Sequence, residues 1–165
     1  GKVVICKQCD NIPEAKRRLL SLETTLESRK MHHEIFKYCK EEFLVEDYYH
    51  CCFEAVKGVY SRIRVLTNIL DKDGTELLDI VFSKNKPLLV INNMSNQTEK
   101  DEFRGLKELI LSVHYLIKNK VSHTTRYNNE IEFYFCLDIL AIVSRIHYYL
   151  DEAQQTCFTG ENFQK

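Results

Sequence analysis

The chain has 165 residues, of which 44% are hydrophobic and 28% are charged, a balance typical of one globular domain with a sizeable core. Its formal net charge of −1 argues against a protein that binds polyanions through overall charge, so any nucleic-acid contact has to use a local patch. Only five glycines and two prolines occur, which favours long helices over many short strands joined by turns.

Neither a membrane-spanning stretch nor a secretory signal is expected. No apolar run approaches the roughly 20 residues that a helix needs to cross a bilayer, and the apolar residues near the start are too few for a signal peptide. Gly1, in place of an initiator methionine, predicts that a further segment precedes the chain. The seven cysteines are odd in number and lie mostly within helical patterns, which indicates reduced thiols and a cytoplasmic protein.

Three helices are predicted in the first half of the chain, over residues 11–29, 32–44 and 47–70. Asn11 and Asp47 are placed to cap the first and the third. Apolar side chains recur every three or four residues. In the third helix they are Tyr48, Cys52, Ala55, Val59, Ile63, Leu66 and Leu70.

A short helix and an extended segment are predicted next. Asp73 and Glu76 have the spacing of a capping box, with Asp in the role of the usual Ser or Thr, for a helix that ends near Phe82. Residues 87–91 are strand-like and are followed by a polar run. We therefore expect an extended connector or a short hairpin arm there.

Two long helices complete the predicted fold, over residues 98–120 and 129–152. The second of them is apolar over most of its circumference, which predicts a central position. Together the elements predict an all-α bundle of about five to six helices over residues 13–152. A flexible segment at 1–12 and a loose polar tail at 153–165 are expected to flank it.

The segment with the most functional information is the octet 116–123, in which Lys118 lies five residues before His123. Five residues correspond to about 500° of helical rotation, so an unbroken helix would separate the two side chains by about 140°. They converge only if the helix ends between them. The β-branched and hydroxyl residues at 121–125 permit such an end.

A cation and an imidazole at one helix end have the chemistry that metal-free RNA cleavage needs. The imidazole transfers a proton, and the cation stabilises the extra charge on the phosphoryl group. Five Lys or Arg and one acid lie between residues 104 and 126, and hydroxyl and amide donors lie beside them. Candidate substrate-binding residues are Ser122, Lys120, Arg126 and His114. The same pattern is also consistent with helix capping, because cations and histidines commonly stabilise helix C-termini.

A zinc site is the second open possibility. Cys6 and Cys9 have the spacing of half a zinc site, which His32 or His33 would complete. A single CxxC without a second pair is equally consistent with free thiols on a mobile N-terminus.

Several segments together resemble the Ymh-type family of bacterial proteins, over roughly residues 14–152. The matching segments are 45–57, 63–64, 73–77, 97–106, 116–123 and 149–152. That family looks like a branch of the HEPN superfamily. The resemblance implies a small all-α domain that commonly dimerises, found in antiphage, abortive-infection and toxin systems. Many members of the superfamily are ribonucleases that need no metal or other cofactor.

The resemblance assigns roles to three residues of the octet: His123 as general acid and base, Lys118 as the cation on the phosphate and Asn119 as an orienting donor. The family motif starts with arginine and often continues with proline and alanine, where this chain has Lys118, Lys120 and Ser122. Lysine keeps the charge but lacks the planar fork of arginine. Two functions therefore stay open, a HEPN-type endoribonuclease or a catalytically impaired dimerisation and regulatory module.

The resemblance also implies that two protomers bring their motifs together in one composite RNA-cleaving site. Glu54 and Arg64 match further family positions, and we expect them to form a buried structural pair.

Overall fold

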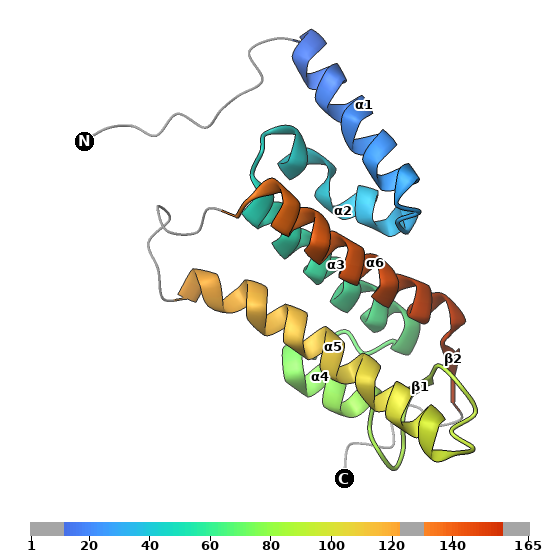
Figure 1. The fold of residues 1–165 in the computed structure, drawn as a ribbon. Coiled ribbons are helices and arrows are strands. Elements are labelled where there is room, and N and C mark those ends of the chain that lie inside the picture. The colour runs from blue at the N-terminus through green and yellow to red at the C-terminus, as the bar shows by residue number, and fades with distance from the viewer. Residues whose placement is uncertain (1–11, 123–130, 157–165) are drawn as a thin grey trace.

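The computed structural model describes residues 12–122 and 131–156, with side chains placed over 16–118 and 131–156. These residues form an all-α bundle of six helices with one very short sheet, as the sequence predicts (Figure 1). In chain order the helices are α1 (Ile12–Ser28), α2 (His33–Leu44), α3 (Tyr48–Thr67), α4 (Gly74–Val81), α5 (Gln97–Ser122) and α6 (Phe133–Glu152).

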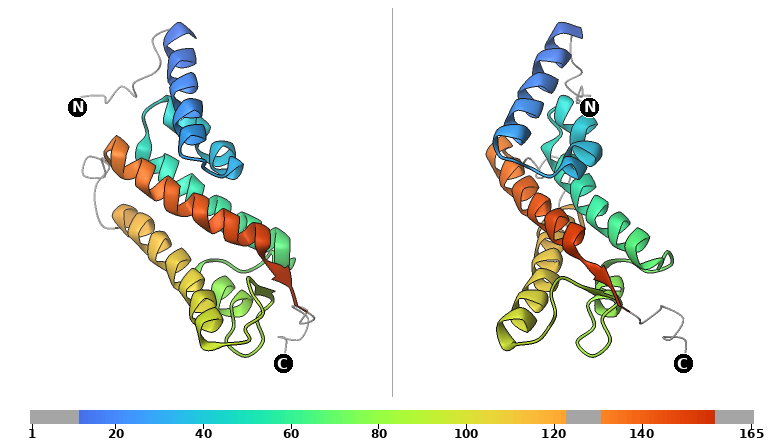
Figure 2. Two further views of the ribbon diagram at one scale, coloured as in Figure 1. Left: turned by 45° about the vertical axis from the view of Figure 1, so that its right-hand side comes forward. Right: turned by 90° about the vertical axis from the view of Figure 1, so that its right-hand side faces the viewer.

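Helices α3 and α6 lie side by side at the centre of the molecule (Figures 1 and 2). α2 packs against both of them, and α5 packs against the same pair further along. α1 and the sheet lie toward opposite ends of the molecule (Figure 2). The central position of α6 confirms the prediction made from its apolar circumference.

The apolar composition of α6 is explained by its place in the core. Nine of its residues are buried, including Leu140, Val143 and His147. By length and composition α6 is also the one helix in 12–122 and 131–156 that could cross a membrane. That is weak evidence, because the core helix of a soluble protein passes the same test.

Side-chain caps fix where four of the helices begin, and at α5 the Asn96 side chain accepts a hydrogen bond from the backbone N–H of Glu99 at 3.0 Å. Asp47 accepts a hydrogen bond from the backbone N–H of His50, and Asp73 accepts one from Gly74, which confirms both predicted starts. The capping box at Asp73 is incomplete, because the Glu76 carboxylate instead pairs with Lys72 at 2.6 Å. The fourth cap is His32, whose imidazole accepts from the N–H of Glu34 at the start of α2.

Helices α2 and α3 approach each other closely at Gly58 of α3. A Cβ atom at this position would lie 2.4 Å from Cδ2 of Tyr38 in α2, closer than such atoms can approach. Glycine therefore lets α2 and α3 pack together here. Free thiols fill the core where these helices meet α6; they are Cys39, Cys51, Cys52 and Cys136.

Two expectations from the sequence are corrected. Gln154 and Gln155 form strand β2 (Gln154–Gln155), which pairs antiparallel with β1 (Leu89–Val90), although we expected them in a loose tail. A two-residue strand has no periodicity that a sequence pattern can reveal. Glu54 and Arg64 do not pair with each other either. Glu54 pairs with Lys57 at 2.7 Å.

Candidate functional site

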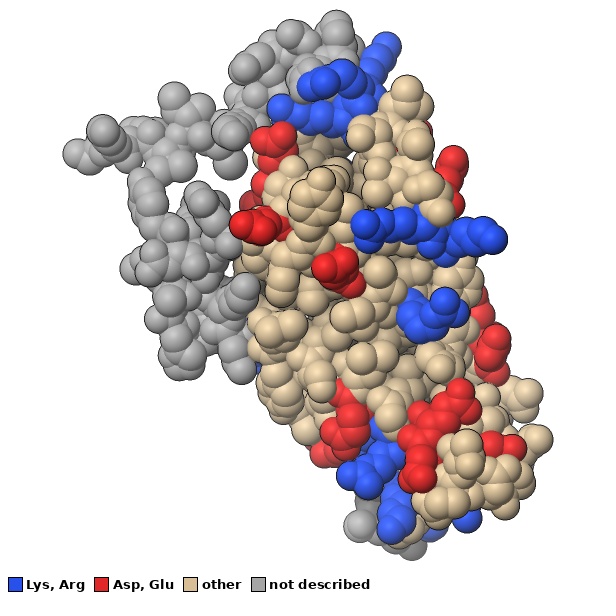
Figure 3. Space-filling model, viewed as in Figure 1, with Lys and Arg blue, Asp and Glu red and all other residues tan. Residues whose placement is uncertain are grey.

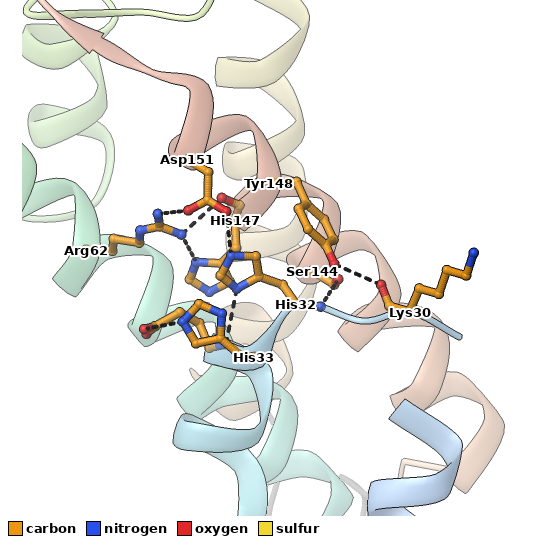
Figure 4. A network of polar contacts seen from close by, with 9 residues as sticks. Lys30, His32, His33, Arg62, Ser144, His147, Tyr148 and Asp151 are labelled. Carbon is orange, nitrogen blue, oxygen red and sulfur yellow. Dashed lines mark hydrogen bonds and ion pairs between the residues drawn. The ribbon is translucent and has the colours of Figure 1, made fainter. Parts of the chain in front are cut away.

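Two clusters of polar side chains contain histidine. The first, which we call the His32 network, consists of His32, Arg62, Ser144, His147 and Asp151 (Figure 4). It joins the start of α2 to α3 and to the last turns of α6. The second, which we call the Lys118 region, consists of Tyr60, Thr75, His114, Tyr115 and Lys118, and joins α3 and α4 to α5.

Every polar group of the His32 ring has a protein partner. Nε2 lies 2.8 Å from Oδ2 of Asp151, and Nδ1 accepts the hydrogen bond from Glu34 that caps α2. Nδ1 is thus an acceptor, and Nε2 carries the hydrogen toward the carboxylate. The backbone N–H of His32 donates to Oγ of Ser144 at 2.7 Å. His32 therefore has no free nitrogen for a substrate or a metal.

Arg62 links the other members of the His32 network. Its guanidinium donates to the backbone oxygen of His147 at 3.0 Å and forms an ion pair with Asp151. Partial burial acts to raise the pKa of Asp151, but hydrogen bonds from Arg62 and His32 outweigh it and lower that pKa. The carboxylate stays ionised between two donors.

His147 is fully buried inside the His32 network. Burial, followed by the nearby charge of His32 and Arg62, lowers the pKa of His147 to about 3. Nδ1 lies 3.4 Å from the Arg62 guanidinium, so the hydrogen of the neutral ring belongs on Nε2. That N–H has no hydrogen-bond partner within the described part of the chain. An imidazole that is neutral and enclosed cannot exchange protons with a substrate in solution.

The alternative of a zinc site at the N-terminus gains no ligand from His32. His32 has both nitrogens engaged, and its neighbour His33 stacks on it with ring centroids 4.3 Å apart. Cys6 and Cys9 lie outside the described residues. Over 12–122 and 131–156, no group of three His, Cys, Asp or Glu side chains is arranged to hold a metal ion.

The position of Lys118 follows from the apolar stripe of α5. The buried residues of that helix are Phe103, Leu106, Ile110, Val113 and Ile117. Lys118 comes directly after the last of them and is turned by about 100° toward solvent. It has no ion-pair partner in the described ranges. Lys118 therefore presents an unneutralised cation near the C-terminal end of α5.

Five of the other predicted site residues belong to the end of α5 or follow it. Asn119, Lys120 and Ser122 lie in the last turns of the helix, which runs unbroken through Ser122. The sequence predicts that the helix ends between Lys118 and His123. In the structure it continues at least through Ser122. His123 and Arg126 lie outside the described residues.

His114 lies one turn before Lys118 and is half-buried. Burial, together with the charge of Lys118, lowers the pKa of His114, while Asp73 acts in the opposite direction. Its ring packs against Tyr60 with centroids 5.0 Å apart. The Tyr60 hydroxyl is buried without a hydrogen-bond partner among the described residues, and burial is the main cause that raises its pKa well above the usual value of a tyrosine. The predicted proximity of His114 to Lys118 is confirmed; its role in substrate binding stays a prediction.

Sequence reasoning missed Tyr115, the residue between His114 and the exposed Leu116. The Tyr115 hydroxyl lies 2.7 Å from Oγ1 of Thr75 in α4. The residue as a whole remains 45% exposed. A tyrosine one position off the apolar stripe of a helix is a weak signal by itself, because exposed aromatic residues are common on protein surfaces.

The carboxylates of α4 and its N-cap are mostly paired. Asp73 pairs with Arg64 at 2.6 Å, and Asp79 pairs with Lys107 at 2.7 Å. On the face of the molecule seen in Figure 3, Lys and Arg side chains gather at separate places and form no continuous basic band. Lys118 is thus an exposed cation without an ion-pair partner in the described ranges, and the face seen in Figure 3 has no extended basic surface.

A comparison with protein families gives one match. A family model described as "Protein of unknown function (Hypoth_ymh)" matches residues 29–150, which include the Lys118 region, the octet 116–123 and the His32 network except Asp151. No curated protein matches significantly. No solved structure matches significantly either.

Proposed function

The chain belongs to the Hypoth_Ymh family, and we propose that it is a HEPN-type endoribonuclease that cuts RNA without a metal ion. The observation that carries this proposal is the exposed, unpaired Lys118 in the last turns of α5, five residues before His123. A neutral imidazole, His114, lies one turn earlier. A cation and an imidazole in one place can bind a phosphodiester and transfer its proton.

The proposed reaction uses the ribose 2′-hydroxyl as nucleophile. His123 acts as general base and takes the hydroxyl proton, and the 2′-oxygen forms a bond to phosphorus. The bond from phosphorus to the 5′-oxygen then breaks, and a protonated imidazole gives that oxygen a proton. The products are a 2′,3′-cyclic phosphate and a 5′-hydroxyl. Lys118 stabilises the additional negative charge on the phosphoryl oxygens, while Asn119 orients them.

A homodimer is part of the proposal. Two copies of Lys118 and His123 would line one composite cleft, as the HEPN resemblance implies, so that each protomer supplies half of the groups. The cellular role we propose is RNA cleavage in a cytoplasmic defence, abortive-infection or toxin system of a bacterium.

The test is cleavage of single-stranded RNA in EDTA by the wild type and by His123→Ala. We expect the substitution to reduce the rate roughly 10²- to 10⁴-fold, the usual contribution of general acid–base catalysis. His50→Ala is the matched control, because His50 is an exposed histidine that pairs with Asp47 and lies outside the Lys118 region. Equal rates for wild type and His123→Ala, or no cleavage by either protein, would exclude the nuclease.

The substitution Lys118→Arg tests the alternative of an impaired dimerisation and regulatory module. That alternative is favoured by lysine at the position where the family motif has arginine, because the ammonium cannot bind two phosphoryl oxygens as a planar fork. For a competent nuclease we expect a change of less than about tenfold, equivalent to 1.4 kcal/mol. A much larger gain would assign the native protein to the alternative.

A further inference from the structure

Tyr115 is an exposed aromatic residue held in a fixed orientation. Its hydroxyl lies 2.7 Å from Oγ1 of Thr75, and its ring meets His114 edge to face with centroids 5.5 Å apart. The residue as a whole is 45% exposed to solvent. Because the hydroxyl contacts Thr75 and the ring edge contacts His114, the ring loses little conformational freedom when a flat ligand stacks on it.

The charge beside Tyr115 is positive. Lys118 lies three residues further along α5, and side chains at this spacing are neighbours on a helix surface. The carboxylate of Asp73, which affects the neighbouring His114, is neutralised by Arg64. The ring and the unpaired ammonium together suit a ligand that has a flat apolar part and an anionic part.

A nucleotide has both parts. Tyr115 and Lys118 are separated by about 4.5 Å along the helix axis, and the flexible lysine stem extends this reach. One nucleotide can therefore place its base on the ring and its phosphate at the ammonium. A purely apolar protein surface fits less well, because it would remove Lys118 from water without supplying an anion.

We infer that Tyr115 is a stacking platform for an unpaired nucleobase of a single-stranded RNA, next to the phosphate that Lys118 contacts. This inference rests on the proposed function, since it names the form of RNA that the same site recognises. Bases stack on aromatic side chains with little sequence preference, whereas bases paired in a duplex are not accessible to such a platform.

The experiment measures binding of a 2′-O-methylated single-stranded oligonucleotide, which has no free 2′-hydroxyl and cannot be cut. The same strand without bases is the second ligand, because it has equal length and charge. We expect the wild type to prefer the strand with bases on the order of 5- to 100-fold, the usual range for stacking on one aromatic residue. Tyr115→Ala removes this preference, and Tyr115→Phe keeps most of it.

Tyr148→Ala is the matched control. Tyr148 is also a partly exposed tyrosine, at 36%, with its hydroxyl held by the backbone oxygen of Lys30 at 3.1 Å. It also has a cation beside it, because the Arg145 guanidinium lies 5.5 Å from its ring centroid. We expect this variant to keep the wild-type preference, since it differs from Tyr115→Ala only in its place on the molecule.

Three results would overturn the platform. The wild type could bind both strands equally or bind neither of them. The Tyr115→Ala variant could keep the preference for the strand with bases, or it could change the oligomeric state of the protein and leave RNA binding unchanged. Sedimentation of the same variants separates the last case, which would assign Tyr115 to a protein interface. The nuclease proposal is judged separately, because these ligands cannot be cleaved. Binding that depends on Tyr115, without cleavage of ordinary RNA, rejects the nuclease and keeps the platform.

Discussion

The His32 network and the Lys118 region each bring histidine together with charged residues, but they differ in how fully their polar groups are used. His32 has a partner for both ring nitrogens and for its backbone N–H, and Arg62 and Asp151 neutralise each other. In the Lys118 region the ammonium has no carboxylate partner within the described ranges, and the Tyr60 hydroxyl has no acceptor there. A saturated cluster fixes helices in place, whereas an unsaturated one next to solvent keeps groups available for a ligand.

His147 shows that a polar atom without a hydrogen-bond partner is not sufficient to make a ligand-binding site. Its Nε2 lacks a partner, as the Tyr60 hydroxyl does, yet the residue is completely enclosed by α2, α3 and α6. In the Lys118 region, by contrast, the unused Tyr60 hydroxyl belongs to a cluster with an exposed cation, Lys118, and an exposed aromatic ring, Tyr115. Access to solvent together with free bonding capacity separates the candidate site from the structural network.

The largest effect that sharpens this comparison is expected from His32→Ala. The variant loses the cap of α2 and the hydrogen bond from the ring to Asp151, and it leaves a cavity in place of a buried side chain, so we expect the free energy of unfolding to fall by about 2–4 kcal/mol. Urea denaturation at neutral pH measures this loss of unfolding free energy. His50→Ala is the matched control, because His50 also lies 2.8 Å from an aspartate oxygen but is exposed. It should cost less than about 1 kcal/mol. Equal costs for the two variants would contradict a structural role for the His32 network.

The second expected effect is acid destabilisation through His147. Its pKa is about 3 in the folded protein, below the usual value near 6.5 of an unfolded chain, so unfolding takes up a proton between these pH values. The contribution of His147 to stability is complete above about pH 6.5 and is lost as the pH falls toward 3. At pH 5 the loss amounts to about 2 kcal/mol.

Urea denaturation at pH 7 and pH 5 tests this expectation, with His147→Gln as the variant that cannot titrate. The difference in unfolding free energy between the two pH values should be smaller in His147→Gln than in the wild type. An identical pH dependence of both proteins would show that His147 is not held neutral.

The smallest expected effect concerns the coupling of Lys118 to His114. Burial is the main cause that lowers the pKa of His114, and the positive charge of Lys118 is the second. Lys118→Gln removes that charge, so the pKa of His114 should rise, as followed by NMR titration of the imidazole. Lys107→Gln is the control. Lys107 lies on α5 two turns before His114, and its charge is already neutralised by Asp79 of α4. A shift that is the same in both variants would point to a general change in net charge.

The helices could be predicted from the sequence because their causes are local. The caps at Asp47 and Asp73 and the periodic apolar residues of α3 act within a few residues, and the structure confirms them. The His32 network could not be predicted, since His32 meets Ser144 and Asp151 across 112 and 119 residues. The pairing of β1 with β2 also joins segments that are far apart in sequence, since Leu89 pairs with Gln155.

The candidate site was predictable in part. The octet identified Lys118, and the spacing of one helical turn placed His114 beside it. The contributions of Tyr60 and Thr75 come from other helices, so only the packing of α3 and α4 against α5 brings them to the site. Tyr115 lies in the predicted helix, but its importance depends on the anchor that Thr75 provides.

The central place of α6 also determines when the protein becomes complete during its synthesis. Translation proceeds from the N-terminus, and domains generally fold as units once their sequence has emerged from the ribosome. Ser144, His147 and Asp151 all belong to α6, so the start of α2 gains its full set of partners only after most of the chain has been made. A nascent chain that stalls before residue 133 contains Lys118 and His123 but lacks the helix that closes the core. We therefore expect interrupted translation to leave an inactive product.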